Sequence, residues 1–271
     1  MKRIISIVLI LIIYIVILFL FLASLPNTKD IYYRRIVDIN SYINDNYEDY
    51  TLVNENTLNY KAVYSQTDLS LFYHPFPGGD GSIRLGSEGN CVLSSTYNSI
   101  CATINPISVL EKAVPEEELA SDSLIKRQGE IYLPSLYLNI RNIAIKKYDK
   151  FEDFHYDELK AIYIEVASSY GEVSYQIHKK LDNNALNEII KYIDEGFSPV
   201  LNLYEHPYYN NHTVAITGYK IYMANDEEIT ILEIMDGQKN ENNTFNAAYL
   251  DFTNIKDNKG KGSVQFFKIK T

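Results

Sequence analysis

Cysteine is scarce in this sequence, which has two cysteines among 271 residues and no tryptophan. So few thiols exclude a disulfide-rich scaffold and the zinc modules that depend on several cysteines. The two are Cys91 and Cys101, and ten residues along one helix would separate them by about 15 Å. A disulfide cannot bridge that distance, so we expect both thiols to be free.

Basic residues are also in short supply, with 25 Lys and Arg against 35 Asp and Glu, for a net charge of −10. Lys2 and Arg3 are the only charged residues before Lys29, so the rest of the chain carries −12. A protein that binds nucleic acid needs a basic face that releases counterions. The charge therefore argues against nucleic acid as a partner.

The N-terminus holds the one long apolar run, from Ile4 to Leu25, which contains no charged residue. A helix of about 20 apolar residues spans the hydrocarbon core of a bilayer. Lys2 and Arg3 precede the run, so the positive-inside rule predicts a single-pass plasma-membrane anchor with the remainder extracytoplasmic. A cleaved signal peptide, with Ala23 near the cleavage site, is the alternative, and both interpretations export the domain.

The rest of the chain, about 240 residues, suits one domain of two subdomains or two small domains. We divide the sequence into a signal-anchor over 1–26, a stalk or linker over 27–60 and a folded domain over 61–271. Helical patterns come first in this domain and strand patterns follow, which predicts an α+β fold. The clearest predicted elements are helices over 92–101, 133–145 and 186–193, and strands over 199–204, 212–219, 229–235 and 264–269.

Cys91 follows Asn90, a residue suited to cap the helix predicted after it. A thiolate is stabilised by a helix N-terminus and by a neighbouring imidazolium, and this position supplies the first. Cys101 falls at the far end of the same predicted helix, where the helix dipole opposes a thiolate. We therefore expect Cys91 to be a nucleophile and Cys101 to be a core residue.

A base for this thiol has to come from elsewhere in the sequence. His212 opens a β-branched strand, and Asp236 follows the strand over 229–235, where a carboxylate can accept from an imidazole and fix its tautomer. His206 is a rival base, but Pro207 and the tyrosines around it predict a surface loop. A metal site of His206, His212 and Asp236 is a further alternative, although no zinc-binding spacing accompanies it.

Together these residues resemble the C39-like peptidases of the papain superfamily. That family typically has a cysteine at a helix start, a strand of the form His-x-Val-x-x-x-Gly-Tyr, and an aspartate that closes the next strand. Here the matching residues are Cys91, the stretch 212–219 and Asp236. The stretch 186–203, a helix followed by a glycine and Pro-Val, is similar to the family's lead into the histidine strand.

The resemblance implies a papain-like fold, in which a helical part carrying Cys91 packs on an antiparallel sheet carrying His212 and Asp236. It implies a Cys-His-Asp triad that cleaves an amide bond of a peptide or protein substrate, without a cofactor or metal. Acyl transfer to an amine would use the same residues. A binding or scaffold protein without turnover is the alternative, because Leu85 and Val92-Leu93 stand where the family has Gln and Gly-Pro.

Overall fold

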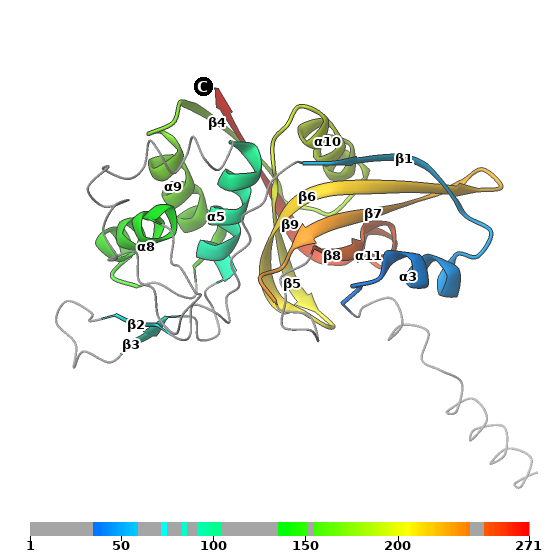
Figure 1. Ribbon diagram of the computed structural model, residues 1–271, viewed down its shortest axis with the longest axis horizontal. Helices are drawn as coiled ribbons and strands as arrows, with labels where there is room; N and C mark the ends of the chain where they lie inside the picture. The colour runs from blue at the N-terminus through cyan, green and yellow to red at the C-terminus, as the bar shows by residue number, and fades with distance from the viewer. Residues whose placement is uncertain are drawn as a thin grey trace, which may run out of the picture. The chain divides into compact units, whose positions relative to one another are not determined.

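The computed structural model describes residues 35–58, 72–74, 83–85, 91–104, 135–150, 154–238 and 247–270 (Figure 1). Contacts divide the chain into two units, Met1–Arg34 and Arg35–Thr271, and every described residue lies in the second. This unit is α+β, with an antiparallel sheet and several helices.

The main sheet has seven strands in the order β4-β9-β5-β6-β7-β8, and β1 also pairs with β6. Every pairing in it is antiparallel. A separate two-stranded sheet pairs β2 (Phe72–His74) with β3 (Ile83–Leu85). The strands of the main sheet are β1 (Thr51–Thr57), β4 (Glu172–His178), β5 (Val200–His206), β6 (Asn210–Ala224), β7 (Glu227–Met235), β8 (Ala248–Asp251) and β9 (Lys261–Lys270).

Three helices lie together beside the sheet and share one hydrophobic core with it (Figure 1). They are α5 (Cys91–Thr103), α8 (Ser135–Tyr148) and α9 (Tyr156–Ala167). Tyr163 of α9 stacks on Phe267 of β9, with ring centroids 3.7 Å apart and planes 8° from parallel. Aromatic pairs of this kind bury large apolar areas, so the contact fixes α9 against the sheet. The other helices are α3 (Ile39–Asn46), α10 (Asn183–Asp194) and α11 (Phe252–Asp257).

Helix α5 is buried on all sides from Val92 to Cys101, which explains its unusual composition. Its polar positions are small residues, and such side chains let a helix approach its neighbours closely. Ser99 is one of them: its hydroxyl donates to the Ser198 carbonyl at 2.6 Å and pairs with the Tyr163 hydroxyl at 3.0 Å. These bonds satisfy polar atoms that would otherwise be costly to bury, and they hold the C-terminal half of α5 against α9 and the residues before β5.

The predicted strands and helices agree with the structure over the second half of the chain. The stretches 212–219, 229–235 and 264–269 lie within β6, β7 and β9, and 186–193 lies within α10. Gly218, part of the His-x-Val-x-x-x-Gly-Tyr stretch, has a packing role, because a Cβ there would come within 2.7 Å of the Asn56 carbonyl of β1. Strand β4 and the extent of α9 were not predicted.

The N-terminal region differs from the predicted stalk over 27–60. Residues 35–58 belong to the compact unit: β1 pairs with β6, and α3 packs apolar side chains against β6 and β7. Asp38 caps α3 by accepting from the Asn40 and Ser41 amides at 3.0 and 3.1 Å. The predicted anchor, Ile4–Leu25, lies outside the described residues. Among the residues that are described, no helix is long and apolar enough to cross a membrane.

Candidate active site

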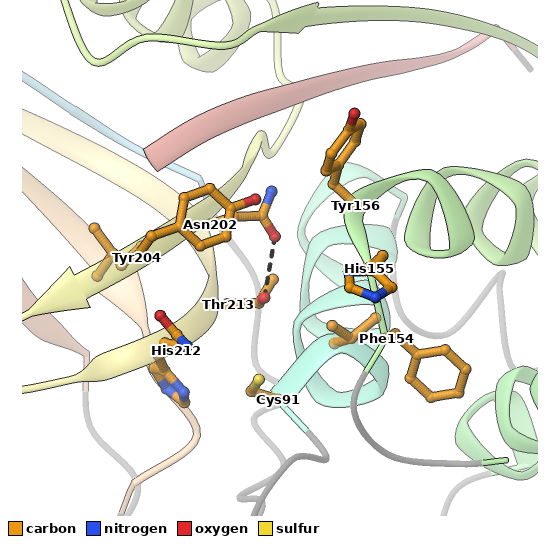
Figure 2. Close-up of a pocket in the computed structure, with 11 residues that line it drawn as sticks. Cys91, Phe154, His155, Tyr156, Asn202, Tyr204, His212 and Thr213 are labelled. Carbon is orange, nitrogen blue, oxygen red and sulfur yellow. Dashed lines mark hydrogen bonds between the residues drawn. The ribbon is translucent and has the colours of Figure 1, made fainter. Parts of the chain in front are cut away.

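Cys91 is the first residue of α5 and is partly exposed. The first amides of a helix have no acceptor within it, and the helix dipole makes this end positive. The prediction that Cys91 begins a helix is confirmed. In Figure 2 this cysteine lies at the end of α5 and faces the strand that carries His212.

The thiol of Cys91 and the imidazole of His212 border the same cavity and influence each other's pKa. Burial raises the pKa of the Cys91 thiol, but the hydrogen bond and charge of His212, together with bonds from Thr213, outweigh burial and leave this pKa below its ordinary value. Burial lowers the pKa of His212, while its bond to Cys91 and the charge of the thiolate raise that pKa by more. Both shifts favour the charged forms, so the pair is suited to exist as thiolate and imidazolium.

His212 is oriented by the main chain of Asp236. Its Nε2 lies 2.8 Å from the Asp236 carbonyl oxygen, and since a carbonyl can only accept, Nε2 carries the hydrogen. This leaves Nδ1 as the ring nitrogen for the sulfur of Cys91. His212 is only 8% exposed, so bulk water competes little for the bond to Asp236.

The carboxylate of Asp236, which the sequence assigns to His212, bonds to other groups. Its Oδ2 accepts from Arg35 Nε at 2.6 Å and from the Tyr209 hydroxyl at 3.0 Å. Its Oδ1 accepts from Arg35 Nη2 at 3.2 Å and from the Gln238 amide at 3.0 Å. The structure therefore brings Cys91, His212 and Asp236 together, but the third residue meets the imidazole through its main chain.

Tyr209 covers the imidazole. Its ring stacks on that of His212 with centroids 5.3 Å apart and planes 7° from parallel. Tyr209 lies in the turn between β5 and β6, where Glu205 and Asn210 have the positive φ values of 53° and 55°. Non-glycine residues seldom adopt this conformation, and here it accompanies the turn that directs Tyr209 inward.

A cavity of about 320 Å³ opens beside Cys91 and His212. One wall comes from α5 and the start of α9, and the other from β5 and β6 (Figure 2). Phe154, His155 and Tyr156 lie across the cavity from Asn202 and Tyr204 in Figure 2. The described lining residues are Cys91, Val92, Phe154, His155, Tyr156, Asn202, Leu203, Tyr204, Asn211, His212 and Thr213.

Polar side chains in this cavity are held by a chain of hydrogen bonds. The Thr213 hydroxyl donates to Asn202 Oδ1 at 3.0 Å, and Asn202 Nδ2 donates to the Ser263 hydroxyl at 3.2 Å (Figure 2 shows the first bond). Asn202 is 3% exposed. This network fixes the Thr213 side chain in the wall of the cavity that Cys91 also lines.

His206, the rival base, holds the turn that follows it. Its Nδ1 accepts from the Tyr208 and Tyr209 amides at 3.2 and 3.1 Å. Burial, together with the charge of His212, lowers its pKa to about 4. A histidine that stays neutral and uses Nδ1 to hold a turn is poorly suited to take a proton from Cys91.

Cys101, His155 and His178 make other contacts. Cys101 is buried in the core, and burial raises the pKa of its thiol to about 12. His178 bonds to Gln176 on β4, and His155 precedes α9, where its amide donates to Glu158 at 2.8 Å. Across the residues described above, no group of three or more His, Cys, Asp or Glu side chains is arranged to hold a metal ion.

Two residues of this site, Arg35 and Tyr209, were not predicted from the sequence. Arg35 falls in the predicted stalk, and nothing in its sequence context points to a residue 201 positions away. Tyr209 lies in a tyrosine-rich turn between two predicted strands, so only its closeness to His212 in the sequence could have suggested it. No protein-family model matches this chain, and no curated protein matches it.

Proposed function

We propose that this protein is a cysteine hydrolase that cleaves an amide bond, with Cys91 as nucleophile and His212 as general base and acid. The observation that carries the proposal is the placement of Cys91, at the start of α5, and His212, held by the Asp236 carbonyl, at one cavity. Their interaction lowers the pKa of the thiol and raises the pKa of the imidazole. The pair also borders a cavity large enough for part of a substrate. Reactive cysteines occupy such partly exposed, electropositive positions, whereas structural cysteines are buried and inert.

The chemistry follows from these positions. The thiolate of Cys91 attacks the substrate carbonyl, and the oxyanion that forms lies at the N-terminus of α5, where unpaired amides can donate to it. The imidazolium of His212 then gives its proton to the leaving amine, and the acyl group stays on sulfur. His212, now neutral, takes a proton from water, and the resulting hydroxide attacks the thioester. The carboxylic acid leaves, which regenerates the thiolate of Cys91 and the imidazolium of His212.

The proposed fold is papain-like, and the proposed family is the C39-like peptidases. A helix that begins at Cys91 packs on β6, which carries His212, and Asp236 follows the neighbouring strand β7. This arrangement supports the proposal, since the three residues occur in the order of that family. The substrate class that goes with it is a peptide or protein.

The proposed location is the outer face of the plasma membrane, with Ile4–Leu25 as a single-pass anchor. The support is the uncharged length of this stretch and the basic pair before it. Washing membranes at alkaline pH tests the anchor, because an integral protein stays with the lipid. Protease added to intact cells should digest the domain, whereas full protection of the domain would contradict export.

Thiol reactivity tests the catalytic proposal. The full chain is treated with iodoacetamide between pH 5 and 9, and alkylation of each cysteine is followed by mass spectrometry of peptides. Cys91 is expected to react near neutral pH faster than a small reference thiol, and Cys101→Ala should leave this rate unchanged. The same preparation is then given a mixed peptide library, in which cleavage should disappear with Cys91→Ala.

The outcomes separate the proposal from its alternative. Fast alkylation and Cys91-dependent cleavage support a hydrolase. If Cys91 alkylates no faster than the reference thiol, the mechanism loses its nucleophile, and a binding or scaffold protein at the cell surface becomes the better interpretation. If Cys91→Ala retains cleavage, the activity belongs to another site or to a contaminant.

A further inference from the structure

We propose that Arg35 and Tyr209 are positioning residues, which hold Asp236 so that its main-chain carbonyl, and not its carboxylate, orients His212 toward Cys91. This inference rests on the proposed function of the Cys91–His212 pair. It adds a group of residues, here called the Asp236 clamp, that consists of Arg35, Tyr209 and the amide of Gln238.

The acceptor sites of the Asp236 carboxylate are all in use. A carboxylate offers about four lone-pair sites, and Asp236 receives a donor at each: two from Arg35, one from Tyr209 and one from Gln238. The side chain is 1% exposed. No site is left for the imidazole, so His212 meets the carbonyl instead.

The turn after β7 sets the direction of the Asp236 carbonyl. Gly237 has φ of 69°, a conformation that glycine adopts at little cost. Arg35 spans this turn, because Nη2 also donates to the Gln238 carbonyl at 2.8 Å. One planar guanidinium therefore holds the carboxylate before Gly237 and the main chain after it, and fixes the peptide between them.

Tyr209 contacts both Asp236 and His212. The same side chain that donates to Asp236 also stacks on His212. It therefore restricts the rotation of the imidazole while it holds the residue to which the imidazole donates. Tyr209 and Asp236 are 6% and 3% exposed, so water has little access to these bonds.

Arg35 comes from the N-terminal segment of the compact unit. It is the first residue of the compact unit, and the next contacts along the chain, the Ile36–Tyr249 bridge and α3, attach this segment to the sheet. The N-terminal segment thus contributes to the active site, and a domain that begins at residue 61 would lack the clamp.

The test compares variants of the full chain. Arg35→Gln removes both the positive charge and the guanidinium that donates to the two carboxylate oxygens, whereas Arg35→Lys keeps the charge alone. Tyr209→Phe keeps the stacked ring but loses the hydroxyl donor. Lys220→Gln is the matched control for Arg35, because Lys220 pairs with Glu55 and also joins the N-terminal segment to β6. Tyr208→Phe is the control for Tyr209, since it removes the hydroxyl of an exposed neighbour.

Two measurements are made on each variant. The rate of Cys91 alkylation by iodoacetamide at pH 6 reports the thiolate. Nitrogen-15 spectra of labelled histidine, recorded at pH 9 on the same variants combined with Cys91→Ala so that the imidazole is neutral, report which ring nitrogen of His212 carries the hydrogen. Outer-shell partners of metal-ligating imidazoles typically affect metal affinity or activity by about 10- to 100-fold, and we take the lower end of this range as the scale for His212. We expect Arg35→Gln to slow alkylation on the order of 10-fold and to mix the two tautomers, with partial recovery in Arg35→Lys and a smaller loss in Tyr209→Phe.

The two controls should retain both the alkylation rate and the Nε2–H tautomer. If Arg35→Gln alkylates as fast as the wild type or faster, the freed carboxylate serves His212 at least as well, and the clamp proposal is overturned. If Lys220→Gln loses as much as Arg35→Gln, the effect is general attachment of the segment, and the proposal also fails. A wild-type Cys91 that reacts like a reference thiol refutes the hydrolase alone, because the tautomer spectra still test the clamp.

Discussion

Cys91 and Cys101 lie on the same helix, α5, but their thiols differ in chemistry. Burial raises the pKa of both, and at Cys101 it prevails, so that pKa reaches about 12. At Cys91 the imidazole of His212 and the bonds from Thr213 reverse the effect of burial. The difference between the two ends of one helix has two causes: the pKa of a thiol depends on its partner across the fold and on the helix end at which it lies.

The largest expected contrast is in alkylation of the native protein. Cys101 is 3% exposed and should react only when the protein opens, which in a typical native population is a fraction of about 10⁻³ or less. We expect Cys91 to react at least about 1000-fold faster at pH 6.5. Peptide mass spectrometry after a short iodoacetamide pulse measures the ratio. In urea the two rates should become equal, and a native ratio near one would remove the contrast.

Removing the partner imidazole should abolish most of this difference. An unassisted thiol with a pKa of about 8.5 is only about 0.3% thiolate at pH 6. We therefore expect His212→Asn to slow Cys91 alkylation at pH 6 by about 100-fold.

His206→Asn is the matched variant, because its amide oxygen can replace Nδ1 as acceptor for the Tyr208 and Tyr209 amides. We expect it to change the rate by less than about 3-fold, since the pKa of about 4 keeps His206 neutral. Equal losses in the two variants would mean that the alkylation rate reports turn geometry and not the base.

The pH dependence of Cys91 alkylation should differ between the native and the unfolded protein. Because the folded pKa of Cys91 is lowered, its thiolate persists as pH falls below the ordinary thiol range and is protonated only at lower pH. The alkylation rate of the native protein should thus level off at a pH where that of the urea-unfolded protein is still rising. An inflection at the same pH in both states would contradict the lowered pKa.

The smallest expected effect is on stability. Cys101→Ala removes a buried sulfur and should lower the free energy of unfolding by about 1 kcal/mol. Cys91→Ala should cost less, because that side chain is partly exposed. Urea unfolding followed by circular dichroism measures both. A larger loss at Cys91 would indicate that its main role is structural.

Prediction from sequence succeeded where local pattern and structure agree. The α5 start at Cys91 and the strands that carry His212 and precede Asp236 follow from periodicity and turn residues. The N-terminal residues 35–58 were assigned to a stalk, because they are polar and the exposed strand β1 lacks the alternation of a half-buried strand. Their place depends on pairing between β1 and β6, residues distant in the chain.

Local backbone preferences were enough to place Cys91 at a helix start, His212 at a strand start and Asp236 after a strand end. The packed fold was needed to establish which atom of Asp236 meets the imidazole. That choice depends on Arg35 and Tyr209, which compete for the carboxylate from distant positions. Hydrogen-bond sites on one buried side chain are few, and which donors fill them is settled by packing.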